Sequence, residues 1–129
     1  MTGYVTNIEE KTQQNSYFRE VLFTGPNSQL VVMALGPGEE IGLETHEGVD
    51  QFIRVEVGTG KAILNGKEHK LEDGSAVVIP AGTAHNIVNG SSSQPLKLYT
   101  IYTPPEHPDG TVHKNKAEAT AAEAAHHKH

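Results

Sequence analysis

The chain has no cysteine and no tryptophan among its 129 residues, and aromatic residues make up only 5% of it. The lack of cysteine excludes disulfides, cysteine-ligated zinc and thiol nucleophiles. So few aromatic side chains leave little from which to build a base-stacking platform. Basic residues are also scarce, since ten Lys and Arg face sixteen Asp and Glu, which gives a formal net charge of -6. We therefore expect no nucleic-acid partner, because such partners gain affinity from clustered basic side chains.

Long apolar runs are absent too, and no basic and then apolar leader opens the sequence. A membrane-spanning helix needs roughly 20 consecutive apolar residues, and a secretory leader needs its own apolar stretch. We therefore expect a cytoplasmic protein without a membrane partner. A chain of this length fits one domain with a core of its own.

Short segments rich in Val, Ile, Leu and aromatic residues alternate with turns of Gly, Pro, Asn and Asp. This pattern is typical of a β-sandwich or barrel. The candidate strands are residues 17–23, 29–35, 51–57, 61–64, 68–71, 76–79, 86–88 and 96–103. Asn65-Gly66 is a strong hairpin signal, because both central positions of a type I′ turn need positive φ. The sequence predicts an all-β fold of eight to ten strands, with no helix in its body.

The segment 51–57 alternates cleanly between two faces. Gln51 shares its face with the apolar Ile53 and Val55, whereas Phe52 lies on the opposite face. Because successive side chains of a strand point to opposite sides, the apolar face is the interior one. The alternation therefore places Gln51 inside the domain and turns Asp50 away from the interior.

The character of the chain changes after Pro104-Pro105. We assign residues 1–105 to a single barrel domain and residues 106–129 to a C-terminal arm and tail, either part of the same domain or flexible. The arm carries His107 and His113, and it either crosses the mouth of the barrel or reaches a partner subunit. We favour a structural role, and the alternative is that His107 lies next to the metal ligands and hydrogen-bonds one of them.

The last part of the arm, residues 114–129, is rich in Ala, Glu and Lys and has the propensity for a helix. It lacks an apolar stripe, so we expect it to pack only at its start. The closing His126-His127-Lys128-His129 resembles a tail and is excluded from the site.

The most specific functional signal lies in residues 74–89. This segment reads G-x5-P-x-G-x2-H-x3-N, with His85 as its histidine and every marked position filled. A second segment, residues 37–58, starts at Pro37-Gly38 and closes at Gly58. It places Glu44 and His46 two positions apart, so that both point to the same face of an extended segment.

Together, the two segments resemble the two motifs of the cupin superfamily, small β-barrels that usually hold one divalent metal inside. In that family the first motif reads G-x5-H-x-H-x3-4-E-x6-G and supplies three ligands, and the histidine of the second motif supplies a fourth. The resemblance covers roughly residues 36–102. It implies a double-stranded β-helix, or jelly-roll, formed by a single cupin domain.

Carried onto this sequence, the motifs imply four metal ligands, namely Glu44, His46, Gln51 and His85. Glu44 stands where the family has a histidine, and Gln51 occupies the carboxylate position. Gln51 either binds through its carbonyl oxygen or hydrogen-bonds a bound water. Asp50 is the rival carboxylate, because the family tolerates a spacing that is one residue shorter. Two histidines and one carboxylate suit Fe(II), with Mn(II) also favoured and Zn or Ni possible.

Small cupins are commonly homodimers in which the N-terminal strand adds to the sheet of the neighbour. Phe18, Phe23 and the outward-facing Phe52 would suit such a contact. The resemblance thus implies a homodimer, with a small molecule as the other partner.

For function, the resemblance implies a metal-dependent enzyme acting on a small organic molecule such as a sugar or an oxygenated acid. The reaction would be of the dioxygenase, isomerase or lyase type, with Glu44 as the catalytic base if it is not a ligand. Two alternatives stay open. One is a non-catalytic module that binds a small molecule or a metal, and the other is a barrel with an empty, water-filled interior.

Overall fold

The structure, a computed structural model, describes residues 2–127. Within this range the chain forms nine strands and two helices. In chain order they are α1 (Ile8–Gln14), β1 (Arg19–Thr24), β2 (Gln29–Leu35), β3 (Asp50–Val57), β4 (Gly60–Leu64), β5 (Lys67–Leu71), β6 (Ala76–Ile79), β7 (His85–Val88), β8 (Leu96–Thr103), β9 (Val112–His113) and α2 (Lys116–His127). The predicted all-β fold is confirmed, and the strand count lies within the predicted range.

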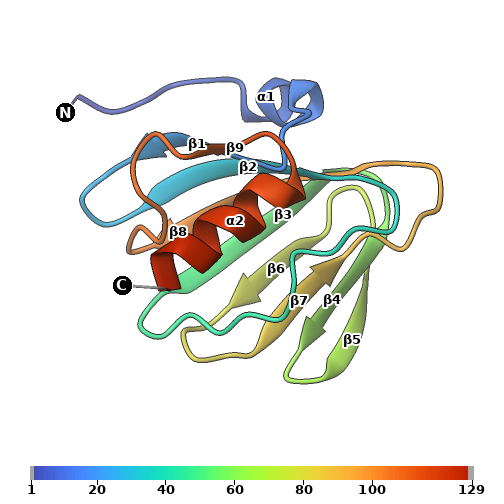
Figure 1. Cartoon of the computed structure of the whole chain (residues 1–129). Helices are drawn as coiled ribbons and strands as arrows, with labels where there is room; N and C mark the ends of the chain where they lie inside the picture. Colours follow the sequence, from blue (N-terminus) through green and yellow to red (C-terminus); the bar gives the residue numbers. More distant parts are fainter. Residues whose placement is uncertain (1, 128–129) are drawn as a thin grey trace.

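The strands form two antiparallel sheets, shown in Figure 1. The larger sheet has the order β6-β3-β8-β2-β1-β9, and the smaller one has the order β5-β4-β7. Residues 39–44 extend the smaller sheet, because Asn89 N donates to Glu39 O (2.8 Å) and Ile41 N donates to Ile87 O (2.9 Å). The segment between β2 and β3 thus runs antiparallel to β7.

The core lies between the two sheets. Ile53 and Val55 of the larger sheet belong to the same buried cluster as Ala62 and Ile87 of the smaller one. Full burial of a Val or Ile side chain contributes about 1.5–3 kcal/mol to the stability of the fold. The alternation predicted for β3 is confirmed, since Gln51 is only 4% exposed on the interior side.

Helix α1 corrects the prediction that the body contains no helix. Asn7 caps it, because its side-chain Oδ1 accepts a hydrogen bond from Glu10 N (3.0 Å). Thr12 is buried, and its hydroxyl donates to Ile8 O (2.7 Å). At seven residues the helix is too short to show an apolar stripe. The only sequence signal is therefore the spacing of the cap and the acidic residue three positions on.

Phe18 differs from the expectation of an exposed contact residue, because its side chain is 3% exposed and belongs to the core. The Arg19 guanidinium lies over its ring, 5.4 Å from the centroid. Phe18 thus packs inside the chain and is not among the exposed aromatic residues that would suit a subunit contact. Phe23 is half-buried and stacks on Tyr4 (5.7 Å between centroids), and Phe52 faces outward as expected.

The arm that follows β8 returns to the barrel and packs on it. Strand β9 pairs with β1, with His113 opposite Arg19, so β1 is not a free edge at that point. Gln29 of β2 holds the arm, because its Oε1 accepts hydrogen bonds from Glu106 N (3.2 Å) and His107 N (3.0 Å). The arm therefore has a fixed place next to the interior.

The helix expected from propensity within residues 114–129 is α2, seen in front of the larger sheet in Figure 1. Ala119, near its start, is buried in the core. Lys128 and His129, the end of the His-rich tail, lie outside the described residues. Neither described helix is both long and apolar enough to cross a membrane.

Candidate metal centre

Glu44 and His85, which come from the two sequence motifs, lie side by side. Each donates its backbone N–H to the carbonyl of the other, at 2.8 Å in both directions. Two residues further on, the carbonyl of His46 accepts a hydrogen bond from Gly82 N (3.0 Å). The backbone thus places the three side chains in one region, where β7 begins.

The side chains of Glu44, His46 and His85 form a cluster in which one potential ligand atom of each lies within 4.8 Å of the others. The Nε2 atom of His46 is 3.8 Å from Glu44 Oε2. The two imidazole rings are tilted by 51°, with centroids 5.2 Å apart. Two imidazoles and a carboxylate at this spacing are able to hold one divalent ion. The structure therefore brings together three of the four residues that the motifs implied.

His85 presents an unused lone pair. Its Nδ1 lies 2.9 Å from the carbonyl of Thr83. Because a carbonyl only accepts, the proton is on Nδ1 and the lone pair is on Nε2. That Nε2 atom is buried without a hydrogen-bond partner. Burial lowers the pKa of His85, which favours the neutral imidazole that binds metals.

His46 is held in a similar way by Glu106 of the arm. The His46 Nδ1 atom is 3.2 Å from Glu106 Oε1, so Nδ1 donates and Nε2 faces Glu44. A carboxylate on the far nitrogen of a metal-binding histidine fixes the ring orientation and makes the ligand more basic. Glu106 is not among the residues predicted from the sequence, because no periodicity in the arm indicates it.

Gln51 is buried on the interior face of β3, as predicted. Its Nε2 donates to Thr100 Oγ1 (3.0 Å), and its Oε1 is buried without a partner. In register it lies opposite Tyr102, whose ring contacts His46 at 6.0 Å between centroids. The rival carboxylate, Asp50, is exposed and accepts a hydrogen bond from Ala81 N (2.9 Å). Asp50 therefore turns away from the interior.

Burial and the charged neighbours shift the pKa values of the cluster in opposite directions. Burial raises the pKa of the Glu44 carboxyl, while the neighbouring His46 favours its charged form. The hydrogen bond to Glu106 raises the pKa of His46 and, reciprocally, lowers that of Glu106. The carboxylates of Glu106 and Glu44 thus favour the protonated form of His46, and burial of the ring opposes it.

His107 and Tyr102 lie on the arm side of the cluster. The Tyr102 hydroxyl and His107 Nε2 are 3.4 Å apart, and their rings meet edge to face at 5.1 Å. Burial lowers the pKa of His107 to about 3, and it raises the pKa of Tyr102 above its usual range. Both side chains are therefore neutral near neutral pH. His113 has a different neighbour, the guanidinium of Arg19 (3.2 Å).

Asn89, the last marked position of the second motif, has a structural role. Its Nδ2 lies within hydrogen-bond distance of the carbonyls of Leu35 (3.1 Å), Gly36 (3.0 Å) and Gln94 (2.9 Å). It thus joins the end of β2 to the loop before β8. Asn89 does not belong to the cluster of Glu44, His46 and His85.

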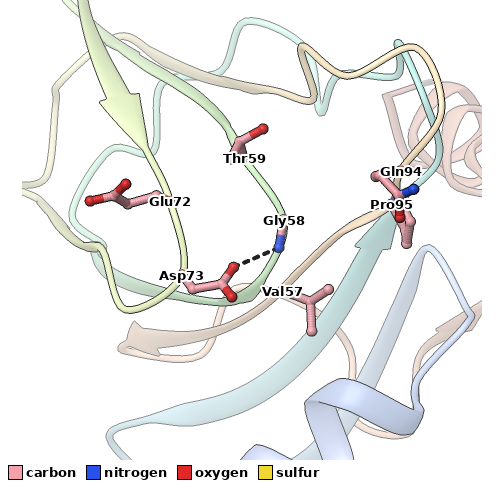
Figure 2. A pocket seen from close by; sticks show the side chains of 7 residues that line it. All are labelled: Val57, Gly58, Thr59, Glu72, Asp73, Gln94 and Pro95. Carbon is pink, nitrogen blue, oxygen red and sulfur yellow. Dashed lines mark hydrogen bonds between the residues drawn. The ribbon is translucent and has the colours of Figure 1, made fainter.

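A surface hollow of about 450 Å³ lies elsewhere and shares no residue with the cluster. Figure 2 shows it, with Val57, Gly58 and Asp73 among its lining residues. Gly58 N donates to Asp73 Oδ1 (2.8 Å), and the positive φ of 98° favours glycine there. A Cβ at this position would also collide with the carbonyl of Pro95. The glycine that ends the first motif therefore serves the fold.

Comparison with known proteins agrees with this geometry. A family model described as "Cupin domain" matches residues 31–102, more than half of the chain. The uncharacterized protein YrkC of Bacillus subtilis (strain 168) is 51% identical over 126 residues, covering 93% of this chain and 67% of YrkC. The uncharacterized protein L612 of Acanthamoeba polyphaga mimivirus is 50% identical over 113 residues, covering 84% of this chain and 70% of L612.

A solved structure shows the same likeness in three dimensions. The crystal structure of BH2720 from Bacillus halodurans superposes with a TM-score of 0.88 at 46% identity, and the match covers 92% of this chain and 93% of that one. The likeness therefore extends beyond the residues that the family model matches, and it includes the flanking segments. On the motifs, the fold and these matches, the chain belongs to the cupin family.

Proposed function

We propose that the protein binds one divalent metal ion through Glu44, His46 and His85, with Gln51 as a fourth ligand, and uses it as an enzyme. The substrate would be a small organic molecule such as a sugar or an oxygenated acid. The proposal is supported by the three side chains whose ligand atoms lie within 4.8 Å of one another.

The proposal rests mainly on a group of inward-facing lone pairs for which the described part of the chain provides no hydrogen-bond donor. Both imidazoles have Nδ1 committed, one to Glu106 and the other to the Thr83 carbonyl, so each directs Nε2 inward. The Glu44 carboxylate adds further lone pairs at the same place. A water molecule donates only two hydrogen bonds, so one water cannot satisfy this set. A cation can, because it accepts lone pairs from every side.

Gln51 fits the same set. Its Nε2 is committed to Thr100, which leaves Oε1 as a buried acceptor without a partner. An unpartnered buried polar atom costs about 1–3 kcal/mol, and an amide oxygen is a ligand that hard divalent ions accept. The donor set favours Fe(II) or Mn(II), with Zn(II) and Ni(II) as further candidates.

When bound, the metal would supply Lewis-acid polarisation of a substrate oxygen. The chain's own residues would perform the remaining tasks. In a site held by the other three ligands, Glu44, whose pKa is raised by burial, would instead accept a proton from the substrate. Glu106 would keep His46 in its orientation, and the neutral pair Tyr102 and His107 would border the site on the arm side. A dioxygenase, an isomerase and a lyase would all use this arrangement.

The metal is tested by elemental analysis in a background where His126, His127 and His129 are replaced by Gln, which removes the terminal histidines. We expect about one divalent ion per chain. His85→Ala should lose it, since no neighbouring side chain replaces Nε2.

His69→Ala is the matched control, because His69 is an exposed histidine on β5. It should keep the ion. An unchanged metal content in the double variant His46→Ala, His85→Ala would refute the metal centre.

Turnover is tested separately, with Fe(II), Mn(II) and Zn(II) forms incubated with panels of sugars and small organic acids. Glu44→Gln should keep its fold and lose product formation. Dioxygen consumption in the Fe(II) form alone would indicate an oxygenase, and product with Mn(II) or Zn(II) under nitrogen would indicate an isomerase or lyase. Saturable ligand binding without product under every metal would leave a non-catalytic binding module.

We also propose a homodimer that uses the outward face of the larger sheet. Leu30, Ile101, Phe52 and Val78 pair in one register row across four adjacent strands. Val78 is 67% exposed, and such an apolar row is typical of an interface. Val78→Asp should convert a dimer to a monomer in size-exclusion chromatography with light scattering. A monomeric wild-type protein would contradict the proposal.

A further inference from the structure

The segment 39–44, which supplies Glu44, contains one residue more than the strand that it faces. It is bridged to β7 at Glu40, opposite Val88, and at Glu44, opposite His85, so the two bridges are four residues apart on the segment and three apart on β7. An extra residue in one strand of an antiparallel pair is a β-bulge, and bulges beside active sites re-aim side chains. The smaller sheet therefore has a bulge directly before the cluster.

The bulge lies at Gly42 and Leu43. The residues on either side of this pair are bonded to the residues on either side of Asn86, so both face Asn86 together. Gly42 has a positive φ of 109°, a conformation that favours glycine and that occurs in one common class of bulge. The two residues thus take the place that one residue has in a regular strand.

The position of the bulge decides which side chain faces His85. Strand β7 is held in register from its other side by β4, with Leu64 opposite His85. Opposite residues of an antiparallel pair point to the same face, and His85 is buried on the interior side, so the residue opposite it points inward as well. That residue is Glu44. With the extra residue one position later it would be Leu43, and Glu44 would point outward.

The chemistry of the two side chains favours this alternative register. Leu43 is 76% exposed and would become buried, and removal of apolar surface from water is favourable. The Glu44 carboxylate would return to water, whereas burial in the interior penalises its charge. The observed register therefore depends on contacts that hold the extra residue in place.

The side chain of Asn86 makes such contacts. Its Oδ1 accepts a hydrogen bond from Gly42 N (2.8 Å), and its Nδ2 donates to Glu40 Oε1 (3.3 Å). The two partners fix the orientation of the amide, because an N–H only donates and a carboxylate accepts. Asn86 follows the inward-facing His85 on β7, so its own side chain points away from the interior. Its amide thus ties the bulge to the strand from the outer face of the sheet.

We propose that Asn86 is a positioning residue of the metal centre, which holds the extra residue at Gly42 and Leu43 and so directs Glu44 towards His85. The inference rests on the proposed function and deepens it, because it assigns the supply of the carboxylate ligand to a side chain outside the cluster. Asn86 acts through Glu44 and makes no contact with the ion.

The register is read by NMR in the metal-free protein. Couplings across hydrogen bonds should join Glu44 N–H to the His85 carbonyl and His85 N–H to the Glu44 carbonyl, since both bonds are 2.8 Å. In Asn86→Ala the coupling from His85 N–H should move to the Leu43 carbonyl or disappear. Couplings between β2 and β8 should remain and show that the fold is intact. Unchanged couplings between Glu44 and His85 would overturn the inference.

Asn15→Ala is the matched control. Asn15 is also a buried asparagine, and its amide makes two hydrogen bonds to the backbone of Tyr17 (2.8 and 3.1 Å). This variant should keep the wild-type register. Asn86→Ser, whose hydroxyl is one bond shorter than the amide, is read in place of Asn86→Ala if the alanine variant does not fold.

A double variant tests the hydrogen bonds themselves. Asn86→Asp with Glu40→Gln keeps both of them, because the new carboxylate accepts from Gly42 N and from the new amide. It should restore the couplings between Glu44 and His85. A double variant with the register of Asn86→Ala would overturn the role of these hydrogen bonds.

Zinc affinity, measured by calorimetry, provides a second readout. Asn86→Ala should bind Zn(II) roughly tenfold to a hundredfold more weakly, as is typical when a residue that orients a ligand is lost. Because Asn86 acts through Glu44, the variant Asn86→Ala, Glu44→Ala should bind no more weakly than the weaker of the two single variants. Asn15→Ala should bind as the wild type does.

The zinc measurement separates this inference from the proposed function. Losses of affinity that add in the double variant, or an unchanged affinity in Asn86→Ala, would overturn the role of Asn86. A wild-type protein that binds no zinc would refute the metal centre instead. The couplings between Glu44 and His85 would then still report whether Asn86 holds the bulge.

Discussion

The Nδ1 atom of His46 lies 3.2 Å from Glu106 Oε1, which joins the first sequence motif to the arm that follows the last long strand. The contact fixes the orientation of the ring and raises the pKa of His46. It therefore controls the pH at which the Nε2 lone pair becomes available. Gln29 places the backbone of Glu106, so the geometry is set by the fold.

We first predict that Glu106→Gln shifts the pH dependence of metal binding. A metal must displace the Nε2 proton of His46, so affinity falls as the pH drops below the pKa of that imidazole. Gln still accepts a hydrogen bond from Nδ1 but lacks the charge, so the pKa of His46 falls. Calorimetry with Zn(II) should show a midpoint at lower pH and roughly tenfold weaker binding at high pH.

Glu68→Gln serves as the control for this prediction. Glu68 is exposed on β5 and pairs with Lys61 at 3.1 Å. The control should match the wild type throughout. A Glu106→Gln protein with the wild-type midpoint would show that the 3.2 Å contact does not set the titration.

The second prediction concerns the removal of the metal. A ligand that binds only the folded state stabilises it by about 2.7 kcal/mol at a hundredfold excess over Kd. For a domain of this size that corresponds to a rise in melting temperature of roughly 10 °C. Differential scanning calorimetry should show the rise with Mn(II) or Zn(II), and EDTA should reverse it. The double variant His46→Ala, His85→Ala should melt at the same temperature with or without metal.

The third prediction concerns stability in acid. His107 has a pKa of about 3 in the folded state, against 6.5 as its ordinary value. Between these values the unfolded state binds one proton more, so the free energy of unfolding falls as the pH falls. The slope approaches about 1.4 kcal/mol per pH unit. Urea unfolding across this window should show a shallower slope in His107→Gln than in the wild type.

The exposed His69 provides the comparison for that slope. His69→Gln should leave the slope unchanged. His46 contributes with the opposite sign, because its raised pKa gives stability that is present below pH 6.5 and is lost as the pH rises through its folded value. A steep acid slope that persists in His107→Gln would place the responsible group elsewhere.

The fourth prediction is that Gln29→Ala detaches the arm. The side chain accepts hydrogen bonds from two arm N–H groups, of Glu106 and His107, and donates to the His107 carbonyl (2.7 Å). Loss of these contacts should cost about 2–4 kcal/mol in urea unfolding. Hydrogen exchange at the amides of residues 106 and 107 should accelerate. Gln14→Ala, at an exposed position of α1, should change neither quantity.

The sequence predicted the strands best where alternation and turn residues coincide. The segments 29–35 and 96–103 have the same bounds as β2 and β8. Gln51 was placed correctly, because a single slip of register would bury the polar face of β3 instead. The cluster of Glu44, His46 and His85 followed from the motifs, since both motifs lie in segments that the fold brings together.

Glu106 and Arg19 could not be predicted in the same way. The place of Glu106 depends on hydrogen bonds to Gln29, and that of Arg19 on the pairing of β1 with β2 and β9. These contacts join residues far apart in the chain, and local periodicity carries no record of them. The composition of the arm gave no indication of either contact.

The match to the family model ends at residue 102 and begins at residue 31. Arg19 precedes this stretch and Glu106 follows it. A chimera that carried residues 31–102 between the flanks of another cupin would keep Glu44, His46 and His85 but lose the buried guanidinium and the acid on His46. The core of such a chimera would keep the cluster that we propose as the metal centre, and the exchanged flanks would change the charges beside it and so the pH at which His46 gives up its proton.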